Sequence, residues 1–148
     1  MLTIVLVIII ALVLYVVYLY NSLVRRKVRC QEGGSDIEVQ LKRRHDLIPN
    51  LIESVKGYMA HEKGVLENVT QARSAIMSSK NTKEMLQKND MLTGALKTLF
   101  AVSENYPDLK ANTNFLQLQQ ELSDTEDKIM AARRFYNANV RDYNTSIQ

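Results

Sequence analysis

Residues 115–147 read FLQLQQELSDTEDKIMAARRFYNANVRDYNTSI, and their apolar side chains recur at intervals of three and four residues. The mean interval is about 3.6 residues, which is the repeat of an α-helix. The members of this stripe are Phe115, Leu118, Leu122, Thr125, Ile129, Ala132, Tyr136, Val140, Tyr143 and Ile147. The pattern therefore predicts one long helix from about Thr113 to the end of the sequence.

Two further segments upstream of this helix have helical periodicity. Between residues 36 and 79 apolar side chains recur in threes, fours and sevens, and Ser35-Asp36-Ile37-Glu38 has the order of a capping box at a helix start. Pro49 lies inside the pattern and predicts a kink, because proline has no N–H and clashes with the preceding turn. Another helix is predicted to begin at Asn81-Thr82-Lys83-Glu84 and to end at Asn105-Tyr106-Pro107-Asp108.

These segments predict an all-α protein. Five glycines and two prolines in 148 residues leave little material for the turns of an all-β fold. Helices this long cannot bury their apolar faces in a small globular body, so we expect an elongated antiparallel bundle of long helices. The interior of such a bundle would be small and would leave part of the apolar helix faces unburied. We therefore also expect contacts between copies of the chain. The predicted self-association residues are Phe115, Leu118, Leu122, Ile129, Tyr136, Val140 and Tyr143, together with the apolar face of residues 37–76.

An uncharged apolar segment precedes the helical body. The first 24 residues contain no charged side chain, and Leu2–Tyr20 reads LTIVLVIIIALVLYVVYLY. A helix of about 20 apolar residues crosses a hydrocarbon core of about 30 Å. We therefore predict a transmembrane anchor over residues 1–24. The alternative is a cleaved signal peptide, which requires basic residues before a shorter apolar run and a small-x-small cleavage site, and these features are missing here.

Basic side chains follow the apolar segment directly. The chain carries 19 Lys and Arg against 16 Asp and Glu, and residues 25–45 hold seven basic and three acidic side chains. Because the positive charge is confined to this stretch, a broad nucleic-acid-binding surface is not expected. Arg25, Arg26, Lys27 and Arg29 are predicted to lie at the membrane surface, where they either contact anionic lipid headgroups or only set the topology. The positive-inside rule places the N-terminus outside and the body in the cytoplasm.

Gly33-Gly34 separates these basic residues from the rest of the chain. We expect residues 25–35 to form a basic juxtamembrane collar with a Gly-Gly hinge, and residues 36–148 to form a cytoplasmic helical bundle. The glycine pair is either a flexible hinge or a kink in a continuous helix. Cys30 is the single cysteine, so no disulfide framework supports the fold, and its thiol is either inert or palmitoylated.

Few residues of the sequence suggest catalysis or metal binding. His61-Glu62 begins like the HExxH motif of metalloproteases, but no second histidine follows, because Val65 stands at the end of that motif. One Cys and two His cannot form a Cys/His zinc site. Lys42-Arg43-Arg44 is expected to pair with carboxylates of a neighbouring helix or with lipid headgroups. We therefore expect no catalytic residues, no cofactor and no metal site.

Several separated blocks of the sequence agree, in order, with one known family. They are Tyr20–Val24, Ile37–Glu62 (IEVQLKRRHDLIPNLIESVKGYMAHE), Ala72-Arg73, Glu104–Lys110 (ENYPDLK), Phe115–Glu121 (FLQLQQE) and Ile129–Asn144 (IMAARRFYNANVRDYN). In these blocks the chain closely resembles the LemA family of bacterial membrane-anchored helical proteins. Gly34 departs from the family pattern, which usually has an aromatic residue there. The resemblance implies a single N-terminal anchor in a bacterial cytoplasmic (inner) membrane, a long-helix cytoplasmic body and no established enzymatic activity.

Two functional hypotheses follow from these features. The first is a non-enzymatic single-pass membrane protein whose cytoplasmic bundle self-assembles into a membrane-associated scaffold that organises or shapes the membrane. The alternative is a membrane-anchored adaptor or sensor that binds a specific membrane protein, such as a protease or kinase. The expected partners are membrane lipids with anionic headgroups and further copies of the chain, with a membrane protein partner in the alternative and no nucleic acid in either.

Overall fold

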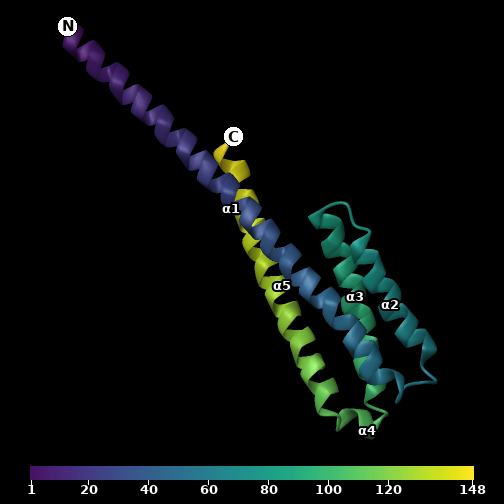
Figure 1. The fold of residues 1–148 in the computed structure, drawn as a ribbon. Helices are drawn as coiled ribbons and strands as arrows, with labels where there is room; N and C mark the ends of the chain where they lie inside the picture. The colour runs from purple at the N-terminus through teal and green to yellow at the C-terminus, as the bar shows by residue number, and fades with distance from the viewer. The chain divides into compact units, whose positions relative to one another are not determined.

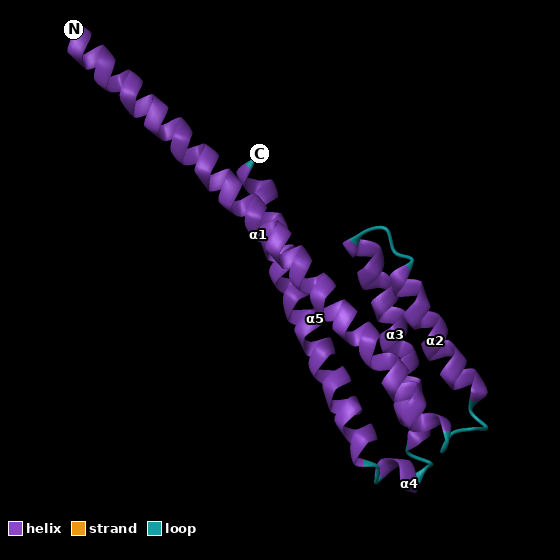
Figure 2. Ribbon diagram, in the orientation of Figure 1, coloured by secondary structure: helices purple, strands orange, loops and turns teal.

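The computed structural model describes residues 1–148, which form α-helices and connections without any strand (Figures 1 and 2). The helices are α1 (Leu2–Lys56), α2 (Lys63–Met77), α3 (Thr82–Ser103), the short α4 (Pro107–Lys110) and α5 (Thr113–Ser146). The chain divides into two compact units, and both α1 and α5 contribute to each of them. The smaller unit consists of Met1–Ser35 and Ala132–Gln148, and the larger unit is Asp36–Ala131. The prediction of an all-α fold with a helical bundle is confirmed.

Besides the short α4, the larger unit contains four helical segments that form a bundle. They are the C-terminal part of α1, all of α2 and α3, which lie side by side (Figure 1), and the N-terminal part of α5. Short connections join them, as is typical of antiparallel neighbours. Its core contains Ile48, Leu51, Val55, Met59, Val69, Ala72, Ile76, Leu92, Leu96, Leu99, Leu109, Phe115, Leu118 and Leu122. The apolar positions predicted from periodicity thus converge on one interior.

The first predicted helix of this bundle differs from the observed one at both ends. Helix α1 continues through Ser35, so the predicted capping box at Ser35–Glu38 is wrong. The preceding helical turns already supply partners for the backbone N–H groups there, and no cap is needed. The predicted kinked helix over residues 36–79 is in fact two helices, because α1 ends at Lys56 and α2 begins at Lys63. Pro49 is accommodated inside α1.

The connection between α1 and α2 begins at Gly57 and reverses the chain. The Val55 carbonyl accepts hydrogen bonds from the amides of both Tyr58 and Met59, which closes the last turn of α1. Reversal places Met59 and Val69 in the same core as Val55, and all three are fully buried. One continuous helix would carry the later apolar residues beyond that core, so burial favours the turn over the uninterrupted helical pattern.

The other helix boundaries agree with the sequence. The Asn81 side chain accepts a hydrogen bond from the Glu84 amide at 2.9 Å, which caps α3 as predicted. Helix α3 ends at Ser103, and Pro107 begins α4, so the predicted break at residues 105–108 is confirmed. Helix α5 begins at Thr113, also as predicted. Side chains cap the starts of α3 and α5, since Asn112 Oδ1 likewise accepts a hydrogen bond from the Phe115 amide at 3.1 Å.

Glu84 at the start of α3 makes one contribution to stability depend on pH. A hydrogen bond from the Lys80 amide, followed by one from Lys88, holds the pKa of the Glu84 carboxyl below its ordinary value. Because this pKa is lower in the folded than in the unfolded chain, the contribution is complete above about pH 4.3 and is lost as the pH falls through the folded-state pKa. We expect the thermal midpoint, followed by circular dichroism, to fall less in Glu84→Gln than in the wild type on acidification. Parallel pH curves would contradict this assignment.

In the smaller unit, Gly33 lies where α1 meets α5. A Cβ atom at Gly33 would lie 3.2 Å from the Cα of Tyr136 and 3.3 Å from the Cδ1 of Phe135. At Gly34 the nearest atom to such a Cβ would be Cε2 of Tyr136, at 3.8 Å. Both glycines have helical backbone. The structure thus assigns Gly33 a role in close helix packing that the sequence did not predict.

Replacing Gly33 with leucine is expected to separate α1 from α5 in the smaller unit. The new side chain would press on the backbone of Tyr136, which cannot rotate away, and overpacking of this kind costs about 1–3 kcal/mol. We expect faster amide hydrogen exchange over residues 132–146. Gly34→Leu is the matched control, because its nearest neighbour is the end of a movable ring. Equal acceleration of exchange in the two variants would contradict the proposed contact.

Candidate membrane-surface site

The N-terminal part of α1 is apolar and uncovered. Every residue from Leu2 to Tyr20 is exposed, and no part of the apolar window is buried by the rest of the chain. By length and composition this helix can cross a membrane. A core helix of a soluble domain would instead be covered by its neighbours, so the exposure favours a lipid environment.

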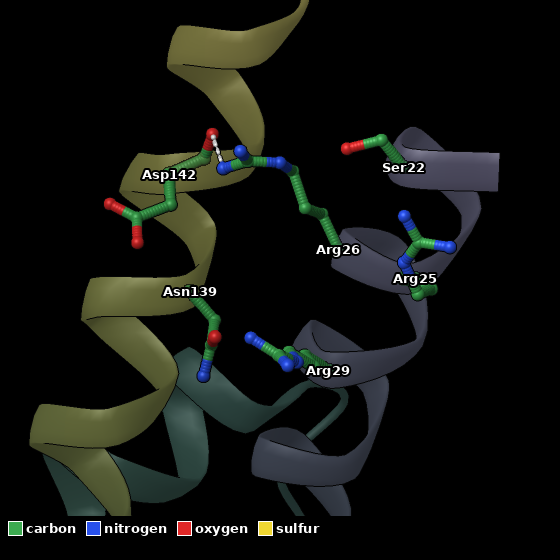
Figure 3. Close-up of a pocket in the computed structure, with 6 residues that line it drawn as sticks. All are labelled: Ser22, Arg25, Arg26, Arg29, Asn139 and Asp142. Atoms are coloured by element: carbon green, nitrogen blue, oxygen red, sulfur yellow. Dashed lines mark hydrogen bonds between the residues drawn. The ribbon is translucent and has the colours of Figure 1, made fainter. Parts of the chain in front are cut away.

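Directly after this segment, α1 and α5 form a polar groove of about 320 Å³ (Figure 3). Helix α1 contributes Ser22, Arg25, Arg26 and Arg29, and helix α5 contributes Asn139 and Asp142. The four α1 positions follow the i, i+3, i+4, i+7 spacing that places side chains on one helix face. Three of the four predicted membrane-surface residues therefore meet in one groove. The fourth, Lys27, does not line it.

One arginine of the groove bonds to the C-terminal end of α5. The Arg26 Nη1 donates a hydrogen bond to the backbone oxygen of Asp142 at 3.3 Å. Carbonyl groups in the last turn of a helix carry the negative end of its dipole, so they attract this guanidinium. In Figure 3 the Asp142 carboxylate points away from the three arginines, and Arg29 extends toward Asn139. Neither Arg25 nor Arg29 forms an ion pair within the chain.

A second charged cluster lies inside the larger unit. Arg44 is 3% exposed, and its Nη1 donates hydrogen bonds to Asn89 Oδ1 at 2.7 Å and to Thr93 Oγ1 at 2.9 Å. It also forms an ion pair with Glu126. Burial holds the pKa of Arg44 below its ordinary value, although the Glu126 carboxylate opposes this effect. The cluster joins α1, α3 and α5 within the bundle.

The predicted pairing of the Lys42-Arg43-Arg44 triplet with a neighbouring helix is confirmed for two of its members. Besides the Arg44 pair, the Arg43 guanidinium lies 3.9 Å from the Glu121 carboxylate of α5. Both sides of that second pair are more exposed than those of the first. The buried pair therefore has a structural role in the bundle.

The predicted self-association residues divide into two groups. Phe115, Leu118, Leu122 and Ile129 are buried inside the larger unit, none more than 6% exposed, so they have no free surface for a second copy. Helices of the same chain cover this part of the stripe. In the smaller unit Tyr136, Val140 and Tyr143 are only partly buried. A continuous stripe shows that one helix face is apolar, but it does not show which helix covers it.

The residues considered above for catalysis, metal binding or modification form no metal site. No group of three His, Cys, Asp or Glu side chains is placed to hold a metal ion. Glu62 lies in the connection between α1 and α2 and accepts a hydrogen bond from the Tyr106 hydroxyl at 3.1 Å. Desolvation, followed by this contact, raises the pKa of Tyr106. Cys30 is a partly exposed free thiol.

The sequence is similar to that of known proteins over most of its length. A model of the LemA family matches residues 33–148. The chain belongs to the LemA family. The match includes the α5 wall of the groove and begins after the arginines of α1. Together with the uncovered apolar helix, membership in this family indicates a membrane-anchored helical protein.

Individual relatives extend the comparison. Protein LemA of Metamycoplasma hominis is 34% identical over 141 residues, which cover 91% of this chain and 63% of that protein. Magnetosome protein MamQ of Magnetospirillum gryphiswaldense is 25% identical over 154 residues, covering 86% of this chain and 57% of the relative. Magnetosome protein MamQ 2 of Paramagnetospirillum magneticum is 24% identical with the same coverage. This LemA-family chain thus spans about three fifths of the length of the relatives it matches.

Proposed function

We propose that this LemA-family protein is a non-enzymatic single-pass protein of a bacterial cytoplasmic membrane, whose helical bundle self-associates into a scaffold that organises the membrane. The observation that carries the proposal is the uncovered apolar helix followed at once by an arginine-lined face. Residues 1–24 are the anchor, residues 25–35 the collar and residues 36–148 the cytoplasmic body, which contains the bundle of residues 36–131 and the part of α5 that belongs to the smaller unit. The excess of positive charge after the anchor favours an outside N-terminus and a cytoplasmic bundle.

Self-association is supported by the smaller unit. There two helices pack together, and a pair of helices cannot cover all of its apolar side chains. Val28 and Phe135 remain 43% and 49% exposed, and Tyr136 and Val140 are only partly buried. A second copy offers the same apolar surface, so association would remove both from water. We therefore assign the contact between copies to this unit and not to the buried stripe of the bundle.

The relatives are consistent with a structural role. Two of them carry names that assign them to magnetosomes, at 24–25% identity. Neither name indicates catalysis. The names of these relatives therefore support a structural role for this chain. The residues assigned to that role are chosen from the surface of this chain alone.

The oligomeric state of the full-length protein tests this proposal. In detergent, analytical ultracentrifugation is expected to show a species larger than one chain. Val28→Glu and Phe135→Glu should shift it toward the monomer, because each places a charge in the proposed contact. Met91→Glu is the matched control, since Met91 is 63% exposed on α3 of the larger unit. A strict monomer over a wide concentration range, or an equal effect of Met91→Glu, would contradict the proposal.

Crosslinking in cells separates the scaffold from the adaptor alternative. A photoreactive amino acid at position 135 is expected to produce a ladder of identical chains. A single band that contains one different membrane protein would favour the adaptor and reject the scaffold. Mass spectrometry of the crosslinked bands identifies which chain is joined to residue 135.

A further inference from the structure

The groove between α1 and α5 carries positive charge that the chain does not neutralise. Arg25, Arg26 and Arg29 share one helix face, and the one carboxylate among the lining residues, that of Asp142, points away from them (Figure 3). Arg26 is bonded to a backbone carbonyl, and the other two arginines have no ion pair. Like charges gathered on one face repel each other, so an anion that enters the groove would relieve this repulsion.

The size and lining of the groove fit a polar headgroup. Its volume of about 320 Å³ lies at the lower end of the roughly 300–1,000 Å³ of small-molecule sites. All six lining residues are polar. A guanidinium presents paired N–H donors that match the oxygens of a phosphate, which makes arginine well suited to phosphate recognition. The Ser22 hydroxyl, which points toward α5 in Figure 3, offers a further donor.

Asn139 lies across the groove from Arg29, on α5. Its Nδ2 donates a hydrogen bond to the Phe135 carbonyl at 2.9 Å, which orients the side-chain amide. Arg29 extends toward this amide in Figure 3. Asn139 therefore lines the groove from the opposite helix, facing Arg29.

The position of the groove along α1 selects the source of the phosphate. Residues 22–29 follow Tyr20, so at 1.5 Å per residue they begin about 3 Å and end about 14 Å beyond the apolar segment. The headgroup region extends roughly 5–8 Å beyond each side of the hydrocarbon core. Side chains on a helix lean toward its N-terminus, which here is the membrane end, so long arginines can reach the headgroups.

We infer that this groove is a specific site for the phosphodiester headgroup of an anionic phospholipid, held by Arg25, Arg26 and Arg29. The inference rests on the membrane placement in the proposed function and adds a defined lipid site to it. Lys27 has no part in the site, although it belongs to the same basic collar. A diffuse attraction of the collar to the membrane surface would involve Lys27 and the arginines equally.

Native mass spectrometry of the full-length protein in detergent tests the site, with dioleoylphosphatidylglycerol as the added lipid. Arg29→Gln is expected to weaken retention of the lipid about tenfold, and Lys27→Gln less than about twofold, although both remove one positive charge. Arg29→Lys should fall between the wild type and Arg29→Gln, because it keeps the charge but loses the paired donors. Equal losses in Arg29→Gln and Lys27→Gln would overturn the inference. Unchanged hydrogen exchange over residues 132–146 confirms that Arg29→Gln leaves the helix pair intact.

Two further measurements complete this experiment. The first identifies the source of the phosphate, and the second tests the lipid site separately from the proposed scaffold. Millimolar inorganic phosphate should leave the bound phosphatidylglycerol in place, and its complete displacement would show a free-phosphate site and overturn the lipid assignment. The same spectra report the number of chains in each particle. Monomers that retain the lipid through Arg29 would support the lipid site and reject the scaffold. Oligomers whose lipid retention does not depend on Arg29 would overturn the lipid site alone.

Discussion

The Phe115→Ala variant is expected to lose about 3–5 kcal/mol of unfolding free energy. Phe115 is 1% exposed, and its ring packs edge to face against Phe100, with centroids 6.1 Å apart and planes at 64°. Truncation would leave a cavity between α3 and α5 and remove this ring contact. Chemical unfolding of the full-length protein in detergent, followed by circular dichroism, measures the loss.

Leu116 provides the matched control for this prediction. It is the next residue along α5 and is 47% exposed, so Leu116→Ala should cost less than about 1 kcal/mol. The pair also tests the sequence-based assignment of Phe115 to contacts between copies. If that assignment holds, Phe115→Ala will lower the oligomeric state and leave the stability of a single chain unchanged. The burial of the ring leads us to expect the opposite result.

Removal of the Glu126 carboxylate is the second large effect that we expect. Glu126→Ala would leave the buried guanidinium of Arg44 without its ion-pair partner, and loss of one member of a buried pair costs about 3–5 kcal/mol. We expect a loss of about 3 kcal/mol, at the lower end, because Asn89 and Thr93 still accept hydrogen bonds from Arg44. Chemical unfolding is again the measurement.

Two controls separate burial from charge in this prediction. The double variant Arg44→Met/Glu126→Leu should regain most of the stability, since it removes both charges and leaves neither uncompensated. Glu121→Ala should cost less than about 1 kcal/mol, because Glu121 faces the exposed Arg43 at 3.9 Å. A double variant as unstable as Glu126→Ala would show that the pair is not the source of the effect.

Much of the fold was predictable because it depends on local interactions. The cap of Asn81 on the Glu84 amide, the break at Pro107 and the start of α5 each involve residues within a few positions of one another. The turn after Lys56 was not predicted. Apolar periodicity continues through residues 57–62, and only the shared burial of Val55, Met59 and Val69 explains why the chain reverses there.

The candidate site was predictable in part. The spacing of Ser22, Arg25, Arg26 and Arg29 already places them on one helix face, and three of them were assigned to the membrane surface from the sequence. That spacing could also have separated Lys27 from the arginines. The contribution of α5 could not be predicted, since the hydrogen bond from Arg26 to Asp142 joins residues 116 positions apart.

The apolar segment of Leu2–Tyr20, the position of the positive charge and the helical nature of the body could all be predicted from the sequence. These properties follow from side-chain polarity and from periodicity over a few turns, which act within one segment. The burial of Phe115 in the core, the approach of Gly33 to Tyr136 and the groove between three arginines and one turn of α5 depend on how the helices pack, and the sequence did not predict them. The physical reason is that burial and close approach depend on which distant helix covers a face, and a helix carries the same stripe whatever covers it.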